Sequence, residues 1–245
     1  MRSYFYYDKL DSTMNEYQRL KELNDGLMAV RAGTQDDGIG RADHLWLSPP
    51  GGLWFSFDVH YDHNIPSFAL FTGYCLHRCL EQMFSPLQGK LKIKWTNDIM
   101  YNDNKLGGIL CRYQPSKQLY TIGIGINTNN TIDAKLGKFG ALSLSSILGH
   151  EISNPFLYRA LIKSIEGSSS MMGNELAYLT YCNEHLFGKN RWAIVEMGGL
   201  KVKVEIIGIN NSGALIIRKE MGEFITMHTG SILEFLEPDR VFLDR

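Results

Sequence analysis

The residues of this chain best suited to bind a charged ligand lie in the stretch KWTNDIMYNDNKLGGIL, residues 94–110. Apolar positions flank the polar tip NDNK, which predicts two strands joined by a turn because Asn and Asp side chains bond their own backbone. The second strand opens with Lys105 and continues into Gly107 and Gly108. A cation beside two glycines indicates either a ligand that approaches the backbone closely or a surface hairpin with a solvated lysine.

A long loop, GTQDDGIGRADHLWLSPPGG at residues 33–52, is the second candidate site. Long ordered loops with little periodicity tend to be functional. The amides around Gly38 and Gly40, next to the guanidinium of Arg41, form a plausible anion cradle. A flexible surface loop is the alternative interpretation.

Two further segments could contribute ligand contacts. In the strand segment LYTIGIGIN, Gly123 and Gly125 point to the same face, which predicts either a ligand groove or a closely packed neighbouring strand. Ser12 and Thr13 are N-cap candidates for the first helix, with Glu16 completing a capping box from Thr13. Hydroxyls and amides at a helix start can also hold a polar ligand group.

Periodicity and turn residues predict the elements that position these segments. Besides the hairpin, strands are expected at residues 4–9, 27–32, 53–61 and 119–127. Helices are expected at residues 14–23, 67–83 and 141–148, from 154 to a soft spot near 167, and onward to 187. Together these elements predict an α+β domain over residues 1–188.

The chain changes character after Gly188. Only short strands are expected beyond it, at residues 191–196, 202–209, 214–218 and 224–228. Their separators, MGGLK, NNSG and EMGE, are typical of hairpins. Residues 189–245 are therefore expected to form a second, small domain, an SH3-like β-barrel.

The composition is that of an ordinary soluble globular protein, with 44% hydrophobic and 21% charged residues in 245. A formal net charge of -1 gives no global basic field for nucleic acid or an anionic membrane. No signal peptide or long apolar stretch is present, so a cytoplasmic protein is expected. Cys75 and Cys79 share a helix face that His77 does not, which predicts reduced core thiols instead of a metal site or disulfide.

Five segments, DST, QDDGIGRADHLW, KWTND, KLGGI and GIGIN, resemble in order and spacing the motifs of the biotin–protein ligase family, which adenylates biotin and passes it to a carrier lysine. The resemblance covers essentially the whole chain. It implies a class II synthetase-like fold, a mixed central sheet flanked by helices, without an N-terminal DNA-binding domain. It also implies biotin and ATP as substrates, Mg²⁺ as cofactor, and a biotin carboxyl carrier protein or domain as partner. An exposed sheet edge leaves a homodimer open as well.

The resemblance implies roles for individual residues. Lys105 and Arg41 would be catalytic, and Asp98 would be catalytic and a metal ligand. The biotin site would consist of Ser12, Thr13, Gln35, Gly38, Ile39, Gly40, Arg41, Lys105, Gly107, Gly108, Gly123 and Gly125. The nucleotide site would consist of Arg41, Trp46, Lys94, Asn97 and Asn127.

The chemistry of such a reaction fits these residue types. Attack of a carboxylate on an α-phosphate brings two anions together, so the site must neutralise them by positioned charge. Arg41, Lys105 and a Mg²⁺ held partly by Asp98 would supply that charge. Asp98 is also a candidate to assist the acceptor amine in the second step.

The sequence departs from the family pattern in the long loop and in one turn. Where the family loop reads close to GRGRRGR, this chain reads GIGRADH, so that Ala42 and His44 replace cations. This change is expected to weaken retention of the adenylate. Thr96 replaces the usual proline of KWPND, which is expected to affect only the turn.

Two alternatives remain. A lipoate or octanoate ligase of the same superfamily would show an RRxSGG-type run or a nucleophilic Cys or Lys, and Cys111 has no obvious base beside it. A biotin-binding module with weakened catalysis would explain the arginine-poor loop, although the retained Lys105 and Arg41 count against it.

Overall fold

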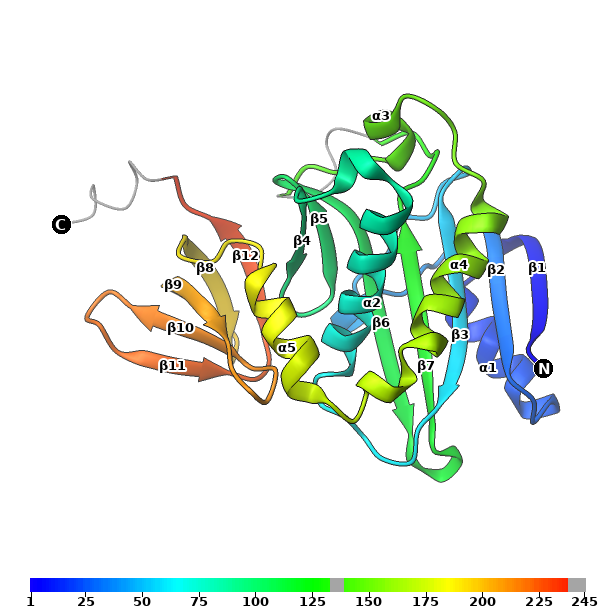
Figure 1. The fold of residues 1–245 in the computed structure, drawn as a ribbon, viewed down its shortest axis with the longest axis horizontal. Helices are drawn as coiled ribbons and strands as arrows, with labels where there is room; N and C mark the ends of the chain where they lie inside the picture. Colours follow the sequence, from blue (N-terminus) through cyan, green and yellow to red (C-terminus); the bar gives the residue numbers. More distant parts are fainter. Residues whose placement is uncertain (133–138, 238–245) are drawn as a thin grey trace.

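The computed structural model describes residues 1–132 and 139–237, which form two β-sheets with accompanying helices (Figure 1). β1 and β2 of the larger sheet are parallel, and all its other neighbouring strands are antiparallel. The predicted α+β fold with a mixed central sheet is therefore confirmed. The strand order in the larger sheet is β1 (Ser3–Leu10), β2 (Met28–Gln35), β3 (Leu53–His60), β7 (Leu119–Ile126), β6 (Asn104–Gln114), β5 (Asp98–Tyr101) and β4 (Leu91–Lys94).

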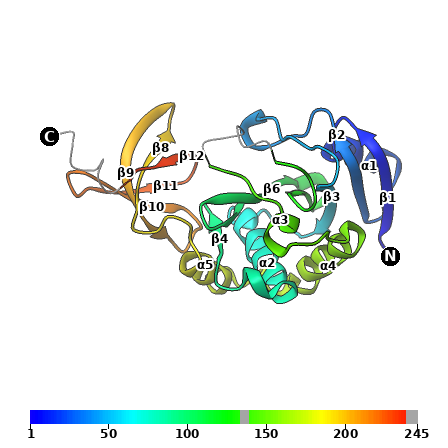
Figure 2. The same cartoon turned by 90° about the horizontal axis from the view of Figure 1, so that it is seen from above.

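Helices cover both faces of this sheet. Side chains alternate along β2, so that Ala29 joins the main core while Met28 and Val30 pack with Tyr17 of α1 on the opposite face. Figure 2 shows α2, α4 and α5 together on one side of the sheet. The α-helices are α1 (Thr13–Leu23), α2 (Phe68–Met83), α3 (Leu144–Leu148), α4 (Asn154–Gly167) and α5 (Glu175–Glu184).

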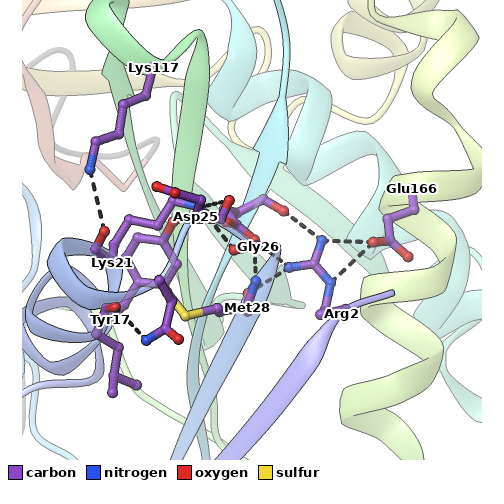
Figure 3. A network of polar contacts seen from close by, with 11 residues as sticks. Arg2, Tyr17, Lys21, Asp25, Gly26, Met28, Lys117 and Glu166 are labelled. Carbon is purple, nitrogen blue, oxygen red and sulfur yellow. Dashed lines mark hydrogen bonds and ion pairs between the residues drawn. The ribbon is translucent and has the colours of Figure 1, made fainter.

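A buried ionic cluster fixes α1 to the sheet (Figure 3). Asp58 of β3 is fully buried and accepts hydrogen bonds from Tyr17 at 2.9 Å and Lys21 at 3.1 Å, both on α1. Arg2 donates to Asp58 at 2.5 Å and to Glu166 of α4 at 2.7 Å. A buried carboxylate requires such pairing because an unpaired charge is costly to desolvate. The cluster therefore holds the helix whose first turn carries two of the predicted ligand residues.

The start of α1 differs in one detail from the sequence prediction. Ser12 is the N-cap, and its Oγ accepts the Met14 N–H at 3.2 Å. Thr13 is already the first helical residue, so the predicted capping box between Thr13 and Glu16 is wrong. The Thr13 hydroxyl is instead available for contacts across the sheet.

The C-terminal region forms a five-stranded antiparallel sheet. Four of its strands match the predicted ones, whereas β12 was not predicted. Within residues 1–132 and 139–237, no pairing of β11 with β12 closes the sheet into a barrel; the small SH3-like β domain is supported, but not its closure. The strand order is β11 (Phe224–Met227), β10 (Leu215–Lys219), β9 (Leu200–Ile209), β8 (Trp192–Met197) and β12 (Ser231–Phe235).

The remaining sequence expectations concern cysteines and membranes. Cys75 and Cys79, both on α2, are buried in the main hydrophobic core, as predicted. Over the described parts of the chain, no helix is long and apolar enough to cross a membrane.

Candidate active site

Most predicted site residues converge on one cavity of about 270 Å³. It lies where the start of α1, the end of β2, the long loop and the strands β5, β6 and β7 meet. Gly38 and Gly107 do not line it, and Asn127 lines a neighbouring cavity of about 840 Å³. The predicted residues that line the first cavity are Ser12, Thr13, Gln35, Ile39, Gly40, Arg41, Trp46, Lys94, Asn97, Asp98, Lys105, Gly108, Gly123 and Gly125.

One end of the cavity is a hydrogen-bonded polar group. The N–H of Thr13 donates to Oε1 of Gln35 at 2.7 Å, which satisfies one of the free amides at the helix start. Gln35 Nε2 donates to the hydroxyl of Ser48 at 2.7 Å. The Thr13 hydroxyl lies 2.8 Å from that of Ser56 on β3. This end can therefore donate and accept hydrogen bonds with a polar ligand group.

The floor of the cavity is bare backbone, and Trp46 lies on it. A Cβ added at Gly125 would lie 2.5 Å from Nε1 of Trp46, and one added at Gly108 would lie 2.7 Å from its ring carbon Cζ3. Only glycine allows the indole to approach this closely. The buried Nε1 has no hydrogen-bond partner among the described residues. A flat ligand that used the same floor would have to displace this ring.

The loop that carries Trp46 is internally hydrogen bonded. The N–H of Gly40 donates to the carbonyl of His44 at 2.7 Å, and the N–H of Trp46 donates to the carbonyl of Gly38 at 2.7 Å. Between them, Ala42 turns the chain with a φ of 49°. Residues 38–46 of the predicted loop thus form a compact hairpin that presents Arg41 at its tip.

A row of charges closes the other end of the cavity. Nζ of Lys105 lies 2.8 Å from one oxygen of Asp98, and Nζ of Lys94 lies 3.9 Å from the other. Burial lowers the pKa of Lys94 to about 8, because the low-dielectric surroundings disfavour its charge; Asp98 opposes this, while Lys105 and Arg41 add repulsion. Lys105 also lies over the Trp46 ring, 4.7 Å from its centroid. The net charge here is positive, as an anion site requires.

Arg41 adds a third cation. Its Nη1 donates to the hydroxyl of Thr96 at 2.5 Å, so the expectation that Thr96 affects only the turn is wrong. Its Nη2 donates to the carbonyl of Gly230, immediately before β12 of the C-terminal sheet, at 2.6 Å. Burial lowers the pKa of Arg41, and the charge of Asp98 raises it. The cation therefore joins the two sheets at the cavity.

The second cavity shares four lining residues with the first: Gln35, Leu45, Trp46 and Lys105. Asn127 faces the second cavity, and its side chain is held by Asn130, whose Nδ2 donates to Oδ1 of Asn127 at 3.1 Å. Two adjacent ligands placed in these cavities would both lie beside the ammonium group of Lys105.

The side chains of the cavity do not form a metal site by themselves, although Asp98 was predicted as a metal ligand. Both oxygens of Asp98 face lysine ammonium groups, which already neutralise the carboxylate. No group of three or more His, Cys, Asp or Glu side chains gathers elsewhere in residues 1–132 and 139–237. Mg²⁺ in nucleotide sites commonly binds one or two carboxylates, waters and substrate phosphates.

Sequence reasoning missed several residues of this site. Ser48 and Ser56 are isolated serines in the sequence, and only the fold brings them to Gln35 and Thr13. Gly230 lies 189 residues from Arg41, and no local sequence pattern marks it as part of the site. Alternation along β3 places Ser56 on the face opposite Phe55 and Phe57, and this face is buried because α1 packs on it.

Several known proteins resemble this chain in sequence and fold. The model of the biotin/lipoate A/B protein ligase family matches residues 4–129. Biotin–protein ligase 2 of Arabidopsis thaliana is 31% identical over 100 residues, 38% of this chain and 30% of that protein. The bifunctional ligase/repressor BirA of Bacillus subtilis is 31% identical over 173 residues, 66% of this chain and 52% of that protein. This chain thus spans about half or less of these two relatives.

Other similarities extend over nearly the whole chain. The biotin–[acetyl-CoA-carboxylase] ligase of Paracoccus denitrificans is 26% identical over 226 residues, 87% of this chain and 93% of that protein. The structure of a biotin protein ligase from Aquifex aeolicus in complex with biotin and ATP has a TM-score of 0.78 and 24% identity, covering 96% of this chain and 97% of that chain. The two molecules share one fold.

Proposed function

Because the chain belongs to the biotin/lipoate A/B protein ligase family, we propose that it is an ATP-dependent biotin–protein ligase. It forms biotinyl-5′-AMP from biotin and ATP and then transfers biotin to a lysine of a biotin carboxyl carrier domain. The observation that carries this proposal is the position of Lys105, which lines two adjacent cavities. Lysine is a compact charge that can contact two anions at once.

Biotin fits the smaller cavity. Its ring system lies on the floor of Gly108 and Gly125 after Trp46 has moved, and its ureido group meets Ser12, Thr13 and Gln35. Hydroxyl and amide groups suit a ureido group because it both donates and accepts hydrogen bonds. The carboxylate then points to Lys105 and Arg41, at the charged end of the cavity.

ATP fits the larger cavity, where Asn127 and Trp46 face the nucleoside and Lys105 faces the α-phosphate. Lys94 and Asn97 line the charged end of the smaller cavity, from where they would face phosphates that extend past Lys105. Mg²⁺ arrives with ATP as part of the nucleotide substrate, and no step is assigned to a metal held by the protein.

The first step is an attack by one carboxylate oxygen on the α-phosphorus. The bond from that phosphorus to the pyrophosphate oxygen breaks, and pyrophosphate leaves with the electron pair. Lys105 and Arg41 lower the barrier because they are already in place when the two anions meet. No covalent enzyme intermediate is required.

In the second step the neutral amine of the acceptor lysine attacks the acyl carbon, and AMP leaves as the bond from that carbon to the phosphate oxygen breaks. The amine must then lose a proton. We assign Asp98 to assist this loss of a proton, because its side chain is the carboxylate that lines the cavity. Residues 1–188 supply this chemistry and residues 189–245 form the second domain, which reaches the site through Gly230.

One assay tests the proposal. The purified protein is incubated with ATP, Mg²⁺ and an apo carrier domain, offering biotin and lipoate separately, and the mass of the carrier is measured. A gain of one biotinyl group is the expected result. A lipoyl gain would instead identify a lipoate ligase. Binding of biotin by calorimetry without any mass gain would identify a binding module and refute the ligase.

A further inference from the structure

Arg41 is a cation whose charge the described residues leave without a carboxylate partner. Its hydrogen-bond acceptors are the Thr96 hydroxyl at 2.5 Å, Oδ1 of Asn97 at 3.1 Å and the Gly230 carbonyl at 2.6 Å. All three acceptors are neutral. By contrast, Lys105 is paired with Asp98 at 2.8 Å. The guanidinium therefore keeps its full charge for a ligand, while its direction is fixed by neutral oxygens.

The turn that carries Thr96 is itself anchored on both sides. The indole N–H of Trp95 is buried and donates to the carbonyl of Gly213 in the C-terminal region at 2.9 Å. Nδ2 of Asn97 donates to the carbonyl of Ile109 on β6 at 2.9 Å. The Thr96 hydroxyl is thus presented from a fixed point between the two sheets.

The loop offers Arg41 little other support. Its neighbours Ala42 and His44 add no permanent charge, and the hairpin fixes only its backbone, through the His44 N–H donating to the Arg41 carbonyl at 3.0 Å. A long side chain held only by its backbone would sample many rotamers, and each anion contact would then require it to be ordered.

We propose that Thr96 is a positioning residue for Arg41. Its hydroxyl, with the Gly230 carbonyl, holds the guanidinium at the cavity, where it meets the carboxylate and phosphate anions of the reaction. The inference rests on the proposed ligase function. The hydroxyl of Thr96, which lies outside the loop, orients the guanidinium of Arg41 in the loop.

The test compares Thr96→Val, which keeps the shape but removes the hydroxyl, with Thr96→Ser, which keeps the hydroxyl. Thr180→Val, an exposed change on α5, is the matched control. Adenylate formation is measured as kcat/KM with biotin and with ATP varied in turn, and biotin Kd is measured by calorimetry. Loss of one hydrogen bond to a charged group should lower kcat/KM about 10- to 100-fold in Thr96→Val. Thr96→Ser should restore most of it, and Thr180→Val should stay within about twofold of the wild type.

A double-mutant cycle asks whether Thr96 acts through Arg41. In an Arg41→Ala background, adding Thr96→Val should change kcat/KM by less than about twofold. The same large loss in both backgrounds would overturn the inference, as would a Thr96→Val enzyme equal to the wild type. If Thr96→Val does not fold, Thr96→Ala takes its place in the cycle.

The proposed function and this inference fail in different ways. A wild-type protein that binds biotin but forms no adenylate refutes the ligase alone, and the biotin Kd of Thr96→Val against that of Thr96→Ser then decides the role of Thr96. A weaker Kd in the valine variant only would support it, and equal Kd values would overturn it. A wild-type protein that neither binds biotin nor forms adenylate overturns both.

Discussion

Replacing Lys94 by methionine should stabilise the protein at neutral pH while it slows catalysis. Lys94 is only 9% exposed, and burial lowers its pKa from 10.5 to about 8. At pH 7 it is therefore a buried cation whose desolvation is not fully offset by Asp98, 3.9 Å away. Removing it leaves Asp98 paired with Lys105 at 2.8 Å, so no orphan charge is created.

The size of the effect follows from the pKa. A difference of about 2.5 pKa units at about 1.36 kcal/mol each gives about 3 kcal/mol as an upper figure. The unbranched methionine fills the space of the lysine stem, although the contact of Nζ with the Phe139 ring, 3.9 Å from its centroid, is lost. We expect Lys94→Met to raise the free energy of unfolding at pH 7 by about 1–3 kcal/mol, or Tm by about 3–8 °C.

The sign of the pH dependence gives the sharper test. Between pH 8 and 10.5 the unfolded chain binds more protons at Lys94 than the folded protein does, so wild-type stability gains from this group as pH rises. The variant lacks that gain. The stability difference between the two proteins should therefore be largest near pH 7 and shrink towards pH 10.

Urea unfolding followed by circular dichroism at neutral and alkaline pH measures this difference. Lys163→Met, an exposed change on α4, is the control and should show no pH-dependent difference from the wild type. The single-turnover rate of adenylate formation should fall about tenfold or more, because a charge beside the phosphates is lost. A Lys94→Met protein less stable than the wild type at pH 7, or a difference unchanged by pH, would refute the reasoning.

Three further predictions follow from the site and the core. Lys105→Ala should lower kcat for adenylate formation about 10²- to 10³-fold with little change in Tm, because a preorganised charge is removed; wild-type turnover in that variant would exclude the assigned role. Gly125→Ala should push Trp46 off the floor and shift its fluorescence emission, since the new methyl would lie 2.5 Å from Nε1; an unchanged spectrum would contradict this placement. Asp58→Asn should lower the free energy of unfolding by about 3–5 kcal/mol, measured in urea, because two buried cations lose their carboxylate; a variant as stable as the wild type would show that the ionic cluster is dispensable.

Local patterns predicted most of the elements of the larger sheet. The alternation of Phe55, Phe57 and Val59 with polar residues in Leu53–His60, and the turn residues at the NDNK tip, report directly on strand and hairpin geometry. β12 (Ser231–Phe235) was not predicted, because its five residues include Glu234 and lack a clear alternating face. Whether the C-terminal sheet closes depends on twist and strand pairing, which a local pattern does not encode.

The site could be predicted as a set of residues but not as an arrangement. Glycines and cations in known motifs identified the cavity walls. The contacts of Thr13 with Ser56 and of Arg41 with Thr96 join residues 43 and 55 positions apart, and no periodicity reports on such pairs. Trp46 illustrates the limit most clearly, because its motif position predicts proximity to a ligand but not that its ring covers the glycine floor.

The contact between Trp46 and the glycine floor also bears on how the sequence can change over evolutionary time. A side chain added at Gly108 or Gly125 collides with the indole, and a smaller residue at 46 would leave the floor uncovered. Substitutions at these three positions should therefore be tolerated together and rejected singly. In a library that randomises all three, we expect folded variants to pair a larger floor residue with a smaller residue at 46, and active variants to keep both glycines, because biotin would use the same floor as the indole.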